Sequence, residues 1–137
     1  MSSLDRRDVI QGAALVAALA AVSTVQPAQA AAGLFYVIAE IVAKPGSEAA
    51  VREILTNVAE KSRTTEPGCK LYTLLEVQKS PGRFLTYEIW VDRAALDAHM
   101  VTQHVKDAIP KLGDGTASSS ILAKPFTQLF LDSVSTA

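Results

Sequence analysis

The chain has 137 residues, with 13 Lys and Arg against 14 Asp and Glu and a formal net charge of −1. This length suits one domain, and the charge balance excludes the broad basic surface that nucleic-acid-binding proteins carry. The single cysteine cannot form an internal disulfide bond and excludes a multi-cysteine zinc or iron–sulfur site. We therefore expect a small molecule or another protein as partner, with no nucleic acid.

The first thirty residues have the pattern of an export signal. Arg6 and Arg7 precede an uncharged, alanine-rich stretch at 12–22, and 28–30 has the small-x-small form that signal peptidase accepts. The pattern resembles a twin-arginine signal peptide. Because the apolar stretch is roughly half the length that spans a bilayer, we expect cleavage rather than membrane anchoring. The sequence therefore predicts a signal peptide at 1–30 and an exported domain at 31–137, periplasmic or extracellular.

The exported part begins with a strand and a helix. Residues 34–43 are almost all apolar and include Tyr, Val and Ile, which predicts a strand that ends at the turn 44–46. Ser47 is the expected N-cap of a helix, since apolar residues then recur every three or four positions over 51–62. The Glu-Pro-Gly sequence at 66–68 should end that helix.

A hairpin and a second helix follow. Residues 69–77 and 83–91 predict two strands, and the turn residues at 79–82 between them indicate that the strands pair as a hairpin. Asp92 can cap a helix that continues to Met100.

The C-terminal part completes the fold. We expect a further short helix before Pro110, a loop over 111–120, a last strand near 121–123 and an apolar tail at 126–131. The order β-α-β-β-α-β is that of the ferredoxin-like α+β fold, a four-stranded antiparallel sheet with both helices on one face. Its other, apolar face would be exposed, so the sequence predicts a homodimer in which a second copy covers it.

Several short motifs occur in a distinctive order and spacing. They are Lys44-Pro45-Gly46, Glu66-Pro67-Gly68-Cys69, Gly82-Arg83-Phe84, Tyr87-Glu88-Ile89-Trp90 and Ala94-Ala95-Leu96-Asp97-Ala98-His99, with His104 five positions later. Over residues 34–131 the chain resembles the antibiotic biosynthesis monooxygenase domain family. The resemblance implies a dimeric α/β barrel, in which each protomer keeps a pocket between its sheet and helices. It also implies activities that range from cofactor-independent oxidation of quinols and polyketide aromatics with O2 to isomerisation and haem degradation.

Cofactor-free oxygenation needs a base that converts a phenol or hydroquinone into an electron-rich anion inside a dry pocket. His99 is the candidate base, because an unperturbed imidazole titrates near pH ~6.5. Alternatively, His99 only hydrogen-bonds a strand carboxylate such as Glu88 and stabilises the fold. His104 lies about 140° further round a regular helix, so both histidines can line one pocket only if the helix breaks between them. We expect His104 on the surface.

Five further residues are candidates for substrate binding. Trp90 shares a strand face with Glu88 and could form a pocket wall or belong to the packed core. Tyr72 and Tyr87 could donate to a phenolate oxygen, unless they face the dimer interface. Asn57 could bind a substrate oxygen or be an exposed helical residue without a role.

We predict neither a metal nor a cofactor. The two histidines have no carboxylate at a supporting spacing, so they do not suggest a facial triad. Haem-degrading relatives combine a Trp, a His and an Asn on the first strand, and residues 35–43 contain no Asn. The leading hypothesis is an exported, cofactor-independent monooxygenase acting on a quinol or phenolic aromatic. The alternatives are a non-catalytic dimer that binds small molecules and, third, a haem-binding or haem-degrading protein.

Overall fold

The computed structural model describes residues 33–135, so the expected signal peptide at 1–30 lies outside the described residues. The described chain contains, in order, β1 (Phe35–Val42), α1 (Glu48–Thr65), β2 (Cys69–Glu76), β3 (Arg83–Trp90), α2 (Arg93–Met100), α3 (Gln103–Leu112) and β4 (Thr127–Leu131). The predicted ferredoxin-like α+β fold is confirmed, with the second helical segment divided into α2 and α3.

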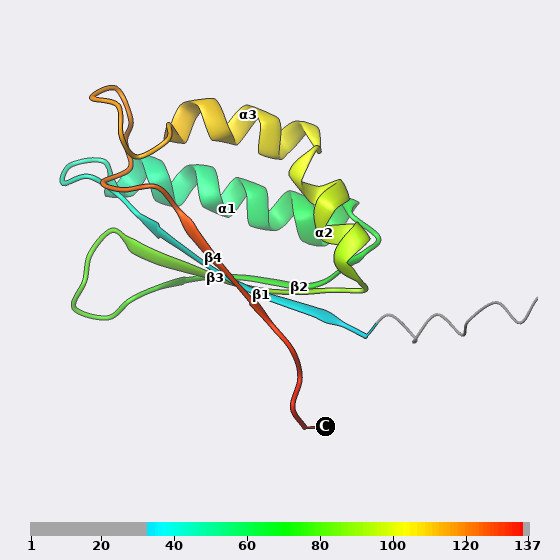
Figure 1. The fold of residues 1–137 in the computed structure, drawn as a ribbon. Helices are drawn as coiled ribbons and strands as arrows, with labels where there is room; N and C mark the ends of the chain where they lie inside the picture. The colour runs from blue at the N-terminus through cyan, green and yellow to red at the C-terminus, as the bar shows by residue number, and fades with distance from the viewer. Residues whose placement is uncertain (1–32, 136–137) are drawn as a thin grey trace, which may run out of the picture.

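The four strands form one antiparallel sheet in the order β2-β3-β1-β4. All three helices lie on one face of this sheet, and the opposite face is open (Figure 1). Alternate residues of β1 accordingly differ in burial: Val37, Ala39 and Ile41 are buried beneath the helices, and the residues between them point to the open face. By the strand pairing, the open face carries Tyr36, Ile38, Leu71, Leu75, Leu85, Tyr87, Ile89, Leu129 and Leu131.

The helix ends follow the sequence signals with one exception. Ser47 occupies the N-cap of α1 without a side-chain hydrogen bond, and the Asp92 carboxylate accepts from the Ala95 N–H at 2.8 Å, which caps α2. The expectation that the last helix ends before Pro110 is wrong, because α3 continues to Leu112. Pro110 lies on the exposed side of the final turn, where water can take the place of the hydrogen bond that proline cannot donate.

The last strand also differs from the expectation. Residues 121–123 make only an isolated bridge, between Leu122 and Ala43, and they bury Leu122 in the core. The stretch expected to be an apolar tail is β4 itself, which pairs with β1 over Tyr36–Glu40. Both stretches are short and apolar, so the path of the loop after α3 decides which of them extends the sheet.

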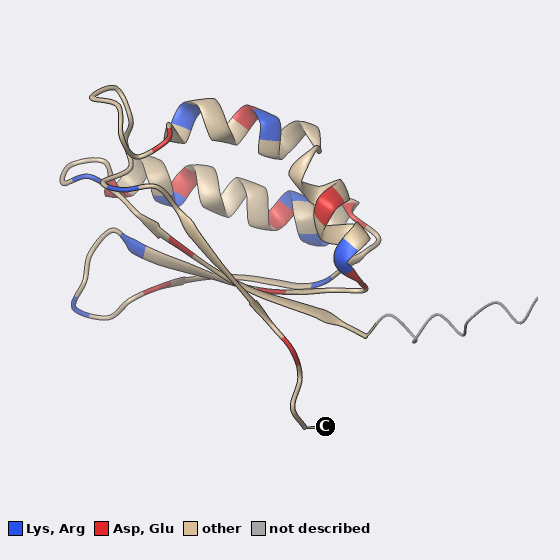
Figure 2. Cartoon of the chain, in the orientation of Figure 1, with Lys and Arg blue, Asp and Glu red and all other residues tan. Residues whose placement is uncertain are grey.

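The core lies between the sheet and the helices in two adjoining clusters, one around Trp90 and Tyr72 and one around Phe84 and Leu122. Charged side chains of both signs are distributed along the helices, loops and strand ends, and neither sign gathers on one side (Figure 2). No helix within residues 33–135 combines the length and the apolar character needed to cross a membrane.

Candidate functional site

A small cavity of about 80 Å³ lies between the sheet and the helices. Most of its lining is apolar and comes from β1, α1, α3 and the segment before β4. The polar side chains that line it are Tyr72, Thr86, Glu88, His99 and Gln128. The lining, mostly apolar with a few polar groups, has the chemistry of a small-molecule site, but the volume is below the ~300–1,000 Å³ of typical ligand pockets, so an aromatic ligand requires the lining side chains to move apart.

His99 is the titratable group that best fits a catalytic role in this cavity. It lies in the last turn of α2 with 4% of its surface exposed, and its ring centroid is 4.7 Å from that of Trp90. Its Nδ1 is 2.8 Å from Oε1 of Glu66, which is the C-cap residue of α1. The partner carboxylate is therefore Glu66 and not the strand residue Glu88. Because Nδ1 is directed to Glu66, Nε2 is the nitrogen available to a ligand.

His104 reaches the same carboxylate. Its Nε2 lies 2.7 Å from Oε1 of Glu66, and its side chain is only 9% exposed, so the expected surface position is wrong. The helix breaks between Met100 and Gln103, which turns α3 so that both imidazoles approach Glu66. Glu66, His99 and His104 are called the His–Glu–His cluster below. Glu66 was predicted only as part of the turn that ends the helix, because no local signal relates it to the two histidines.

A buried hydrogen-bond network lies beneath His99 on β3. Glu88 is 3% exposed and accepts from Trp90 Nε1 at 2.9 Å and from Thr86 Oγ1 at 2.7 Å. Trp90 is fully buried and is a packed core residue rather than a cavity wall. The network therefore gives both oxygens of the buried carboxylate a donor and holds the indole ring against His99.

Tyr72 is the phenol nearest to this network. Its ring meets the Trp90 ring edge-on, with centroids 6.4 Å apart, and it lines the cavity. Burial, reinforced by the negative charge of Glu88, raises the pKa of Tyr72 well above its usual value of 10. Tyr72 therefore remains protonated, with its hydroxyl beside the Glu88 carboxylate.

Two of the predicted binding residues lie elsewhere. Tyr87 pairs with Ile38 and Thr73 on the open face of the sheet, because successive strand residues point to opposite faces. Asn57 is exposed on α1 and lines a separate groove between α1 and α3. Neither can contact a ligand in the cavity that His99 lines.

The single cysteine is partly buried against the core cluster around Trp90. Burial, followed by the nearby charge of Glu66, raises the pKa of Cys69 to about 11. Its thiol therefore remains protonated near neutral pH, as in a small packed residue rather than a nucleophile.

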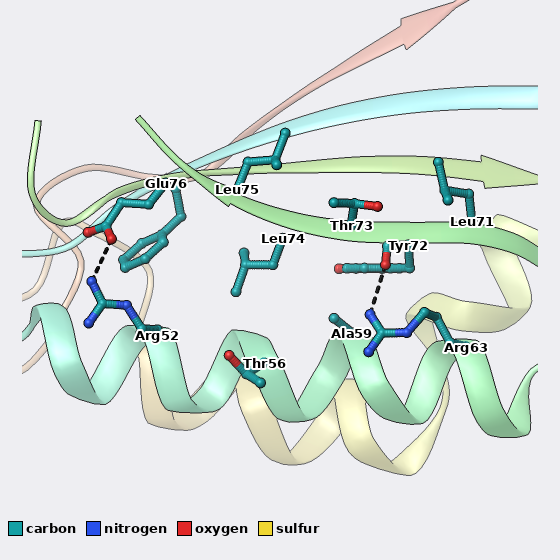
Figure 3. A pocket seen from close by; sticks show the side chains of 11 residues that line it. Arg52, Thr56, Ala59, Arg63, Leu71, Tyr72, Thr73, Leu74, Leu75 and Glu76 are labelled. Carbon is teal, nitrogen blue, oxygen red and sulfur yellow. Dashed lines mark hydrogen bonds and ion pairs between the residues drawn. The ribbon is translucent and has the colours of Figure 1, made fainter. Parts of the chain in front are cut away.

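A larger hollow of about 570 Å³ lies outside the core, between α1 and β2 (Figure 3). Its two arginines already have partners: Arg52 pairs with Glu76 at 2.5 Å, and Arg63 donates to the Tyr72 carbonyl at 2.9 Å. This open hollow is lined by no histidine, and its carboxylate, Glu76, already accepts from Arg52 and from the Gly82 N–H. The cavity beside His99 is therefore the candidate active site.

Comparison with known proteins identifies the family. The family model described as antibiotic biosynthesis monooxygenase matches residues 34–111. The chain belongs to this family. A crystal structure of an antibiotic biosynthesis monooxygenase is 34% identical, with a TM-score of 0.65, and the match covers 74% of this chain and 99% of that one. Rv0793 from Mycobacterium tuberculosis is 26% identical, with a TM-score of 0.67, over 77% of this chain and 99% of that one.

A curated relative is also similar in sequence. The uncharacterized protein sll1783 of Synechocystis sp. is 34% identical over 89 residues, which are 65% of this chain and 56% of that protein. The match spans just over half the length of that protein.

Proposed function

We propose that this family member is an exported, cofactor-independent monooxygenase that uses O2 to oxidise a quinol or another phenolic, polyketide-like aromatic. The observation that carries the proposal is the placement of His99. Its imidazole is buried, its Nδ1 is held by Glu66, and its Nε2 is left for a ligand of the apolar cavity. This is the arrangement of an oriented general base.

The proposed reaction begins when Nε2 of His99 takes a phenolic proton from the substrate. The resulting anion reduces O2 and forms a bond from a ring carbon to one oxygen atom. Loss of water then breaks the O–O bond, so one oxygen remains on the oxidised ring and the other leaves as water. The aromatic substrate supplies all the electrons that O2 accepts, and the proton held by His99 returns with the water.

Other cavity residues support this chemistry. The raised pKa of Tyr72 keeps it protonated, so its hydroxyl could turn from Glu88 to donate a hydrogen bond to the developing oxyanion. The surrounding aliphatic side chains limit access of water, which favours transfer of an electron to O2 over side reactions of the anion.

We further propose that the protein is a homodimer formed through the open face of the sheet. All four strands contribute apolar side chains to this face, which also carries the Glu40–Arg83 ion pair at one end, and Leu129 at its edge is 60% exposed. An apolar surface of this extent on a small domain indicates a partner surface. Leu129→Glu should halve the mass measured by light scattering, and a monomeric mass for the unchanged protein would refute the proposal.

The haem-degrading alternative receives less support. β1 carries no Asn, the residue that haem-degrading relatives have on their first strand. Export remains a proposal that rests on the pattern at 1–30. It predicts that the processed chain is recovered outside the cytoplasm, and recovery of only the unprocessed chain in the cytoplasm would contradict it.

The test of the activity is oxygen uptake by the chelator-treated full chain, offered a panel of hydroquinones and polyhydroxylated aromatics. His99→Ala should lower uptake at least about 100-fold, as expected for loss of a general base. Lys106→Gln, on the exposed side of α3, is the control and should retain uptake. Circular dichroism checks the fold of both variants. Uptake unchanged in His99→Ala would refute the mechanism, and absence of uptake across the panel would favour a dimer that only binds aromatics.

A further inference from the structure

The chain contains two histidines, and both converge on one carboxylate oxygen. Glu66 is the C-cap of α1, His99 lies in the last turn of α2 and His104 lies in the first turn of α3, so three helices meet at this point. The nitrogen and oxygen atoms that they offer all lie within 4.8 Å of one another. Residues far apart in sequence are thus gathered as a compact group of nitrogen and oxygen ligands.

Two hydroxyl oxygens complete the surroundings. Ser62 Oγ lies 3.4 Å from both His99 Nδ1 and His104 Nε2. Thr102 Oγ1, which donates to the His99 carbonyl, lies 3.2 Å from His104 Nε2. Each of these ring nitrogens can carry one hydrogen, yet three oxygens surround the one on His104. Thr102 already donates its hydroxyl hydrogen to the His99 carbonyl, which leaves the two imidazole N–H groups and the Ser62 hydroxyl as donors within a cluster of nitrogen and oxygen atoms that could also ligate a cation.

We propose that Glu66, His99 and His104 bind a divalent first-row transition metal ion, for which Zn²⁺ is the best match. Two neutral imidazoles and one carboxylate form a common zinc ligand set, and three protein ligands leave a position for water. The three side chains are almost buried, and the hydroxyl of Ser62 can hydrogen-bond a bound water from the protein side.

The ion has a route that does not pass through the cavity between sheet and helices. His104 lines the groove between α1 and α3, which has a volume of about 470 Å³ and opens to solvent beside Asn57. The charged residues that line this groove are balanced, with Glu53 and Asp107 against Lys61 and Lys111, so the groove carries no net positive charge that would repel a cation. A cation can therefore reach the cluster from the helical side, while His99 faces the cavity on the other.

The metal-site proposal does not rest on the proposed oxygenase activity, although a bound ion would affect that activity. An ion bound to Nδ1 of His99 displaces the proton there, and the neutral ring then keeps its remaining proton on Nε2. The zinc-bound protein would lack a free base in the cavity. Binding is therefore measured without substrate, so that a protein that binds zinc and never consumes O2 refutes only the oxygenase.

The experiment is a calorimetric titration of the untagged, chelator-treated full chain with Zn²⁺, followed by metal analysis after dialysis. We expect one zinc per chain. Glu66→Gln and His104→Gln should each weaken zinc binding at least about tenfold. Loss of a residue that only hydrogen-bonds a metal ligand already has an effect of that size. Glu60→Gln, an exposed glutamate on the same helix, is the matched control and should bind as the unchanged chain does.

Two results would overturn the proposal: absence of binding by the unchanged chain, or equal affinity in Glu66→Gln and Glu60→Gln. Because the cluster variants could also fail to fold, a second measurement uses the unchanged protein alone. Anomalous scattering at the zinc edge from crystals grown with Zn²⁺ should give a peak between Glu66, His99 and His104. A peak only at other surface groups, or none, would refute the site.

Discussion

Trp90→Phe tests the hydrogen-bond network beneath His99. Trp90 is fully buried, and its Nε1 donates to the buried carboxylate of Glu88 at 2.9 Å. Phenylalanine keeps an aromatic ring in the core but cannot make this bond, so one oxygen of Glu88 loses its donor. The other oxygen retains the hydroxyl of Thr86.

Two terms set the expected loss of stability. A hydrogen bond to a carboxylate contributes about 1.5–3 kcal/mol to stability. The loss lies toward the upper end of that range when the carboxylate that loses its donor is buried, as Glu88 is. The smaller ring leaves a void of about 40 Å³, which costs about 1 kcal/mol at ~24 cal/mol per Å³. Trp90→Phe should therefore lower the free energy of unfolding by about 3 kcal/mol.

The assay is urea unfolding, with all variants at one protein concentration. A double-mutant cycle with Glu88→Gln separates the two terms, because only the hydrogen bond depends on both residues. We expect a coupling energy of about 1–2 kcal/mol, since the amide oxygen of glutamine still accepts a weaker bond. A loss below about 1 kcal/mol in Trp90→Phe, or a coupling near zero, would refute the reasoning.

Three further predictions concern other parts of the chain. Gly115 has a φ of 78°, and a Cβ there would collide with the Lys124 carbonyl, so Gly115→Ala should cost at least about 2 kcal/mol in urea unfolding. Gly33→Ala, with open space around it, should be neutral and is the control. Because the pKa of Cys69 is raised to about 11, alkylation by iodoacetamide should be slow at neutral pH and accelerate only above about pH 10; mass spectrometry showing the rate of free cysteine at neutral pH would contradict this. Two backbone N–H groups lower the pKa of Asp114 from 3.8 to about 2. The contribution of the ionised Asp114 to stability is thus complete above about pH 4 and is lost as the pH falls toward 2. Asp114→Asn should therefore reduce the decrease of Tm between about pH 4 and pH 2. A decrease as steep as that of the unchanged protein would contradict this prediction.

The sequence alone determined the elements that local signals define. The apolar run of β1, the hairpin of β2 and β3 and the Asp92 cap of α2 are each visible within a few residues, because strand alternation and helix capping are short-range effects. The spacing of the motifs was also sufficient to indicate the family, which the match over residues 34–111 confirms. The strand sequences also showed apolar side chains on both faces of the sheet, which indicated that one face stays uncovered in a single protomer.

The tertiary structure decided which side chains share a site. Glu66 and His104 are 38 positions apart, and no local signal relates the end of α1 to the start of α3. They meet because the break after Met100 turns α3 back along α1, which also moves His104 away from the expected surface position. Similarly, the strand register sends Tyr87 to the open face and Trp90 into the core, although both are aromatic residues of β3. Long-range packing fixes these positions, because an aromatic side chain is compatible with both the core and the open face, and the local sequence does not distinguish the two.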